Sequence, residues 1–226
     1  DFRKLCVDTW RAMNPSWEIK VLDMESVWKF LQPSDLPHHW KEMYVAFQSD
    51  AVRLALLQRY GGLWLDPAII CLKPFEFYLT PDWHGAAGIE YVENWLLAAQ
   101  PEHPMIVRWK DIFNSYWNSL HGGWEQACLP KHPMFAHIDL SHMHRFGHDM
   151  RSYLVMHSCF QKMIHEEPEM RRIWQEEMLL FKAEEGALWH LEEVDWTVDK
   201  AMQKWLGPRN QAWEKYVVTH CPVLKF

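Results

Sequence analysis

An acidic residue followed by proline interrupts the most strand-like apolar run of the sequence. The run reads LWLDPAIICL, and Asp66 and Pro67 lie in its middle. Proline cannot donate a hydrogen bond to a neighbouring strand, so the chain must leave regular pairing directly after the acid. Open α/β sheets present their ligand-binding groups where strands end. We therefore expect Asp66 to lie at the end of a strand and to face a cavity.

Two further charges, Asp50 and Arg53, lie three residues apart in the segment SDAVRLALL, which is otherwise apolar nearly all round. A buried helix rarely carries charges without partners, because an unpaired buried ion is very costly. The two charges therefore either pair with each other or face a polar ligand. An internal Asp–Arg pair, or a helix N-cap at Ser49 or Asp50, explains them without any ligand. This stretch alone leaves these alternatives open.

The elements that must position these residues indicate an α/β fold with a helical C-terminal half. Hydrophobic spacing and the placement of proline and glycine predict the boundaries. We expect, in order, a helix before Asn14-Pro15, a strand over 17–23, a short helix over 24–31, one or two helices over 38–60 that meet at Ser49 and stop at Gly61, a strand over 63–72, two short strands around Glu93 and Asn94, and helices over 105–120, 148–165, 169–182 and 197–206.

Composition narrows the class of protein. The length of 226 residues fits a single domain, 1–226. A net charge of −7 argues against sequence-independent binding to nucleic-acid phosphates, so we expect no nucleic-acid partner. Most aromatic side chains fill cores, but any of the 15 tryptophans beyond what the core needs would suit flat ligands such as sugars. Five widely spaced cysteines indicate neither a disulfide framework nor a zinc knuckle, and no apolar stretch approaches the ~20 residues that span a bilayer.

A histidine-rich segment, KHPMFAHIDLSHMHRFGHD, offers a different chemistry. Its spacing is irregular and contains no HExxH pair, so a solvated or acceptor-facing loop is favoured over a metal site. A zinc-dependent hydrolase therefore ranks last among the functions considered. The residues that would bind its metal are His137, His142, His144 and His148, with Asp139 or Asp149.

The central stretch SDAVRLALLQRYGGLWLDPAIICLKPF resembles the signature of the DXD-containing, mannosyltransferase-like glycosyltransferases, most closely their capsular polysaccharide synthesis branch. Ser-Asp, an Arg three residues on, Tyr-Gly-Gly, Leu-Asp and a later Lys-Pro fall in the same order. The similarity covers most of the chain through CVDTWRAMNPSWEIKVLD, NWLLAAQPEHPMI, YLVMHSCFQKMIHEEPEMRRIW and PVLKF. The sequence starts at Asp1 instead of Met and stops abruptly after CPVLKF, so we expect both ends to be cuts in a longer product. The first strand of the family would lie before Asp1.

The resemblance implies a fold of the GT-A type, in which a Rossmann-like mixed sheet with helices on both faces binds a nucleotide-sugar at its strand ends. In this one glycosyltransferase-like catalytic domain, Asp50 and Arg53 match positions near the nucleotide or donor sugar. Arg53 and Asp66 are then the catalytic candidates. Gly61 and Gly62 shape a turn that lets the backbone approach the donor.

The same resemblance makes Asp66 the first acid of the DXD motif, where it helps to hold Mn²⁺ or Mg²⁺. The second acid is replaced by Ala68. A hard divalent cation wants several oxygen ligands, so one carboxylate makes a weaker metal site. This departure places the metal dependence of the chain in question.

The implied reaction transfers a sugar from a nucleoside diphosphate to an acceptor hydroxyl with retained configuration. The departing phosphate takes the acceptor's proton, so no dedicated base is expected. Glu90, Glu93 and Asn94 lie near the end of the next expected strand and are candidates for contacts with the donor sugar. Trp64 and Trp95 are more simply explained by core packing than by stacking on a ligand.

The resemblance also implies a glycan acceptor, and Glu185 in KAEEGALW matches a segment near the acceptor side, although a surface helix end explains it equally simply. Segments beyond the two ends leave peripheral membrane association open, and the location is either the cytoplasm or the Golgi lumen. The alternative to an enzyme is a catalytically silent module that binds a nucleotide-sugar or glycan without turnover.

Overall fold

The computed structural model describes residues 2–80, 85–89, 93–120, 132–145, 148–181, 188, 191, 196–197, 199–200, 203 and 223–226. Within them the largest sheet has four strands, in the order β1 (Gly62–Leu65), β4 (Glu93–Ala99), β3 (Ala86–Ile89) and β7 (Leu179–Phe181). β4 pairs antiparallel with β1 and β3, and β3 pairs parallel with β7. The last residues of β1, β3 and β7 therefore lie at one end of the sheet, beside the first residues of β4. We call this the carboxyl end of the sheet.

Strand β4 is buried on both faces, which explains its almost continuous apolar sequence. Successive side chains of a strand point to opposite faces. Leu97 and Ala99 belong to the hydrophobic cluster formed with the helices α2, α3 and α4, whereas Leu96 and Ala98 belong to the cluster formed with α1 and β2. The sheet thus separates two apolar layers, and the predicted mixed α/β class is confirmed, consistent with a GT-A-like fold.

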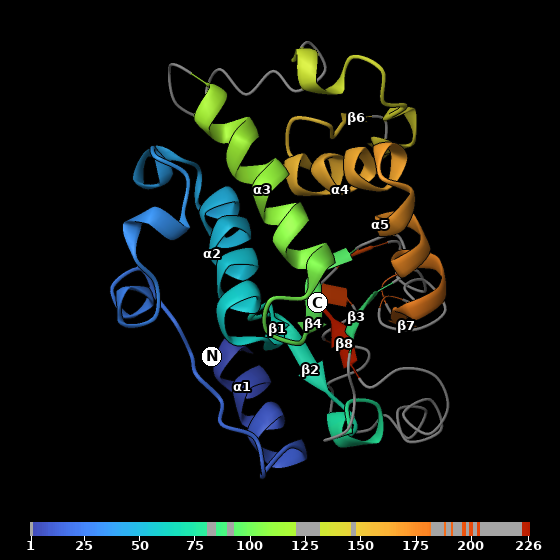
Figure 1. Cartoon of the computed structure of the whole chain (residues 1–226). Helices are drawn as coiled ribbons and strands as arrows, with labels where there is room; N and C mark the ends of the chain where they lie inside the picture. The colour runs from blue at the N-terminus through green and yellow to red at the C-terminus, as the bar shows by residue number, and fades with distance from the viewer. Residues whose placement is uncertain are drawn as a thin grey trace.

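The helices divide between these two layers (Figure 1). Helix α3 (Pro104–Ser119) packs between α2 (Val45–Tyr60) and α4 (Val155–Glu166). Helix α1 (Phe2–Met13) packs against β2 (Ile69–Cys71) on the other side. None of the described helices is long and apolar enough to cross a membrane.

Shorter elements connect these layers within the described part of the chain. They are the 3₁₀ helices η1 (Ser26–Lys29), η2 (Pro33–Asp35), η3 (Trp40–Glu42), η4 (Phe75–Phe77), η8 (Pro133–Phe135) and η9 (Ser141–Met143), the hairpin of β5 (His144–Arg145) and β6 (His148–Asp149), helix α5 (Pro168–Arg172), the π-helical turn η10 (Ile173–Glu177) and strand β8 (Val223–Lys225).

The apolar run around Asp66 and Pro67, expected as one strand over 63–72, forms two strands in two different sheets. The predicted departure from regular pairing directly after Asp66 is confirmed. Pairing with β4 continues as far as Asp66, whose backbone N–H donates to the Trp95 carbonyl at 3.0 Å. After Pro67 the chain enters β2, which pairs antiparallel with β8. The proline therefore marks the point at which the chain leaves the first sheet.

Several predicted elements differ from the structure. Residues 17–23 form no strand, and Val21 is 58% exposed, because alternation alone does not make a strand without a partner to pair with. Of the one or two helices expected over 38–60, a single helix is confirmed, because α2 runs unbroken through Ser49. Asp50 therefore lies inside the helix and caps nothing. The helix expected over 169–182 ends in η10, and β7 follows. Most of the helix predicted over 197–206 lies outside the described residues.

Gly61 and Gly62 form the turn between α2 and β1, and both have positive φ, of 64° and 89°. A Cβ on Gly61 would lie 2.6 Å from Cδ of Pro101 and 2.7 Å from the Ala99 carbonyl oxygen, whereas a Cβ on Gly62 would meet nothing within 4 Å. The close backbone approach that glycine permits at position 61 is therefore to the exit of β4.

Gly61→Ala and Gly62→Ala form a matched pair that separates backbone strain from steric clash. A left-handed backbone costs either variant about 1–2 kcal/mol, and the forced contacts add about 1–3 kcal/mol for Gly61→Ala alone. Urea unfolding should therefore show a clearly larger loss of unfolding free energy for Gly61→Ala. Equal losses for the two variants would contradict the close packing against Pro101 and Ala99.

Candidate functional site

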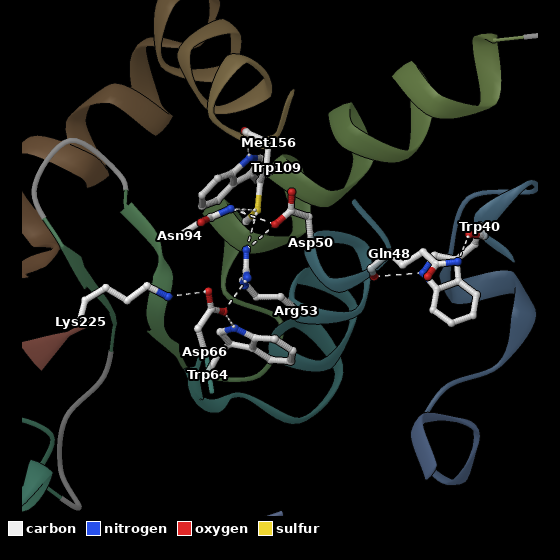
Figure 2. A network of polar contacts seen from close by, with 10 residues as sticks. All are labelled: Trp40, Gln48, Asp50, Arg53, Trp64, Asp66, Asn94, Trp109, Met156 and Lys225. Carbon is white, nitrogen blue, oxygen red and sulfur yellow. Dashed lines mark hydrogen bonds and ion pairs between the residues drawn. The ribbon is translucent and has the colours of Figure 1, made fainter. Parts of the chain in front are cut away.

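Asp66 lies at the carboxyl end of the sheet and is held there by three donors (Figure 2). Its Oδ1 accepts hydrogen bonds from Arg53 Nη2 and from Trp64 Nε1, each at 2.9 Å. Its Oδ2 accepts from Lys225 Nζ at 3.2 Å. The Asp66 side chain is 23% exposed, so it reaches solvent although both oxygens are engaged by the protein.

Arg53 connects Asp66 to a second acid, Asp50. Its Nη1 lies 2.5 Å from Oδ1 of Asp50, and its guanidinium lies over the Trp64 ring, 5.1 Å from the centroid. The Arg53 side chain is only 3% exposed. The internal Asp50–Arg53 ion pair considered from the sequence is present, and Arg53 also pairs with Asp66. We call Asp50, Arg53, Asp66 and Lys225 the charge cluster.

Neighbouring elements hold Asp50 and Arg53, the more buried members of the charge cluster, in place. Asn94 Nδ2 donates to Asp50 Oδ1 at 2.9 Å and to Met156 Sδ at 3.3 Å. Met156 is the second residue of α4, and its Sδ also accepts from Arg53 Nη1 at 3.4 Å. Its backbone carbonyl accepts from Trp109 Nε1 at 2.8 Å. Helices α2, α3 and α4 and strand β4 therefore all contact the same group of polar atoms.

The first turn of α2 is held separately by a reciprocal pair of hydrogen bonds (Figure 2). Trp40 Nε1 donates to the Gln48 carbonyl at 3.0 Å, and Gln48 Nε2 donates to the Trp40 carbonyl at 2.9 Å. These bonds tie η3 to α2 and so help to set the position of the helix that carries Asp50 and Arg53.

The two acids of the charge cluster differ in their titration. Burial raises the pKa of Asp50 to about 6; the Arg53 charge opposes this rise and the Asp66 charge adds to it. Burial also acts to raise the pKa of Asp66, but the Arg53 and Lys225 charges outweigh it and hold that pKa below its usual value. Asp66 is therefore the acid that keeps its charge as the pH falls, and Asp50 is the one that takes up a proton first.

The other predicted donor-site residues are placed as follows. The Asn94 side chain donates a hydrogen bond to Asp50 of the charge cluster. The Glu93 carboxylate accepts a hydrogen bond from Trp95 Nε1 at 3.1 Å. Both residues open β4, and Glu93 is paired with Ile89, the last residue of β3, so they lie near the end of a strand as predicted. They reach the expected place because antiparallel pairing lays the start of β4 beside the end of β1. Glu90 and Glu185 lie outside the described residues.

Three members of the site were not identified from the sequence. Trp64 was assigned to packing, yet it also donates to Asp66. Met156 carries no polar signal that a sequence pattern would single out. Lys225 lies 159 residues along the chain from Asp66, and only its place in the family-like PVLKF segment drew attention to that region.

The residues around Asp66 do not fit a divalent cation. Among the residues that the structure describes, no group of three or more His, Cys, Asp or Glu side chains could hold a metal ion. Arg53 and Lys225 already contact the Asp66 carboxylate. Two like unit charges about 4 Å apart repel by about 4 kcal/mol at an effective dielectric constant of about 20, and a divalent ion doubles this. A cation at Asp66 would therefore be repelled by both of these side chains.

The histidine-rich segment forms no metal centre in the part of the chain that can be placed. His137 Nε2 lies 2.6 Å from Glu166 Oε1, and the Asp139 carboxylate accepts from the Ser141 backbone at 2.9 Å. The side chains of His144, His148 and Asp149 lie outside the description. Nothing in these contacts favours the hydrolase alternative.

The raised pKa of Asp50 predicts a pH-dependent cost of folding. An acid whose pKa is higher in the folded state contributes most stability below its unfolded pKa, and that contribution is lost as the pH rises through about 6. In Asp50→Asn the side chain does not titrate, so this loss of stability with rising pH is absent. Urea unfolding between pH 4 and pH 8 should show the stability of Asp50→Asn rising relative to the original chain as the pH increases. A constant difference across that range would contradict the assignment.

Removing the cation between the two acids should destabilise the fold strongly. Arg53→Met leaves Asp50 and Asp66 without their shared partner, which should cost about 3–5 kcal/mol of unfolding free energy. Adding Asp50→Asn relieves part of the repulsion, so the double variant should lose less than the sum of the two single losses. Urea unfolding of all four proteins at pH 8 measures this coupling, and strict additivity would rule it out.

Comparison with known proteins connects this site to a family. Glycosyltransferase afumC of Aspergillus fumigatus is 24% identical and covers 82% of this chain and 56% of its own length. O-glycosyltransferase braB of Annulohypoxylon truncatum is 26% identical over 58% of this chain and 36% of its own length. Human alpha-1,4-N-acetylglucosaminyltransferase is 28% identical over 34% of this chain and 22% of its own length.

The chain thus spans about half the length of the first of these relatives and a smaller share of the others. No solved structure matches it. The model of the family described as capsular polysaccharide synthesis protein matches residues 3–121, which include Asp50, Arg53, Asp66 and Asn94. Since that match covers more than half of the sequence, the chain belongs to the capsular polysaccharide synthesis protein family.

Proposed function

We propose that the chain is the catalytic part of a glycosyltransferase that moves a sugar from a nucleoside diphosphate-sugar to a hydroxyl group of a glycan or other acceptor. The observation that carries the proposal is the similarity to glycosyltransferase afumC over most of the chain. Two further relatives are also named as glycosyltransferases. The geometry of the described residues supports where the donor would bind.

The carboxyl end of the sheet is where open α/β folds bind ligands. Asp66 reaches it as a charged, partly exposed carboxylate, with Arg53 fixed behind it and Lys225 beside it. A carboxylate accepts hydrogen bonds from the hydroxyl groups of a ribose or a sugar. Guanidinium and ammonium groups bind phosphate oxygens. The charge cluster therefore has both kinds of group that a nucleotide-sugar needs.

The proposed reaction balances without an added base. The bond between the anomeric carbon and the diphosphate oxygen breaks, and a bond from the same carbon to the acceptor oxygen forms. The acceptor's proton goes to the departing diphosphate, on the same face of the sugar, so the configuration is retained. The protein's part is to orient the two substrates and to stabilise the negative charge that develops on the diphosphate.

Asp66→Asn tests the proposal against a matched control. Both Asp66 and Asp35 accept from an arginine at 2.9 Å, and the Asp35 side chain is 16% exposed, but Asp35 lies in η2, away from the carboxyl end of the sheet. We expect Asp66→Asn to lower release of UDP or GDP from a panel of nucleotide-sugars at least about 100-fold, on the scale of one lost electrostatic contact in a transition state. Asp35→Asn should keep the original rate.

Circular dichroism of both variants verifies that they fold. Full turnover by Asp66→Asn would defeat the role of this carboxylate. Binding of a nucleotide-sugar by the original chain with no turnover on any acceptor would instead identify the silent binding module.

A further inference from the structure

We infer that Lys225 supplies the positive charge that meets the donor diphosphate at this site, in the position that a DXD enzyme gives to a divalent cation. The inference rests on the proposed function and names the group that would bind the phosphates. Lys225 lies outside residues 3–121, which match the family model.

The backbone holds Lys225 in place, so its contact with Asp66 does not depend on a loose tail. In the β2–β8 ladder Lys225 is paired with Ile69, and the next residue, Phe226, donates its N–H to the Ala68 carbonyl at 2.8 Å. The turn that takes the chain out of the first sheet at Asp66 therefore also receives the strand that carries Lys225.

The resemblance to the DXD motif implies that Ala68 stands where the second acid would be. In this chain the residue contributes no carboxylate, and its backbone instead binds the C-terminal strand through Phe226. The loss of a metal ligand and the arrival of an ammonium group thus occur at the same three-residue turn. This coincidence indicates that Lys225 takes over the role of the missing cation.

The Lys225 ammonium has donors left for a phosphate. An ammonium group carries three N–H donors, and among the described residues it makes one hydrogen bond, to Oδ2 of Asp66. Its side chain is 21% exposed, whereas that of Arg53 is 3% exposed. Lys225 is therefore the cation of the cluster that an incoming anion reaches first, and Arg53 lies behind Asp66 (Figure 2).

Two contacts orient the ammonium without neutralising it completely. The Asp66 carboxylate shares its charge between Lys225 and Arg53. The centroid of the Trp95 ring lies 5.9 Å from Nζ, and the ring contributes a cation–π attraction. A lysine held in this way is a fixed point charge, which suits the binding of a diphosphate.

The test is isothermal titration of UDP, GDP and inorganic pyrophosphate into the chain, in EDTA and separately with Mn²⁺. We expect at least one of these diphosphates to bind in EDTA, and Lys225→Met to weaken that binding about tenfold or more, as for loss of a charge-assisted hydrogen bond. Lys225→Arg should retain binding, since it keeps the charge. The matched control is Lys162→Met, because Lys162 is an ion-paired lysine of similar exposure, 15%, on α4.

The outcomes separate this inference from the proposed function. Binding that requires Mn²⁺ and is unchanged in Lys225→Met would overturn the role of Lys225 and leave the transferase proposal standing. No binding of any diphosphate or nucleotide-sugar under either condition would overturn both. If Lys225→Met fails to fold, the original chain still tests the inference. Diphosphate binding that occurs only with Mn²⁺ and never in EDTA would by itself contradict it.

Discussion

A buried guanidinium in the middle of α2 is the constraint on which the site depends. Arg53 is nearly inaccessible to solvent, and a buried ion is tolerated only when its charge is matched by close partners. Asp50 from the same helix and Asp66 from the end of β1 supply that match. Helix α2 and strand β1 must therefore hold a fixed relation. Asn94 on β4 and Met156 on α4 extend the same requirement to two more elements.

The break at Asp66 and Pro67 performs a second task in the fold. It ends pairing in the four-stranded sheet and starts pairing with β8, so it joins the main sheet to the C-terminal strand. The same turn presents the Asp66 carboxylate and lies beside the strand whose Lys225 ammonium contacts it. A local departure from regular structure thus places long-range partners together, which is common where proteins build binding sites.

Long, strongly periodic segments were predicted well, and segments that depend on distant partners were not. Helix α3 matches its predicted range almost fully, because its apolar spacing and Pro104 at its start are local signals. Residues 17–23 alternate like a strand but have no strand beside them. Residues 179–181 were assigned to a helix, yet they pair with β3, whose position in space no local pattern reveals. Local patterns singled out Asp50, Arg53 and Asp66, the family resemblance added Asn94, and the structure brings the four side chains together.

The sequence by itself determined where the chain breaks out of its sheet, that α2 carries charges needing partners, and that a glycine turn precedes β1. These features follow from proline, charge and glycine chemistry, which act within a few residues. Only the tertiary structure decided that Asp66 shares its charge between Arg53 and Lys225, and that burial moves the titration of Asp50 instead. The reason is physical: a pKa and an ion pair depend on which groups approach in space, and strand pairing alone brought Lys225 across 159 residues of chain.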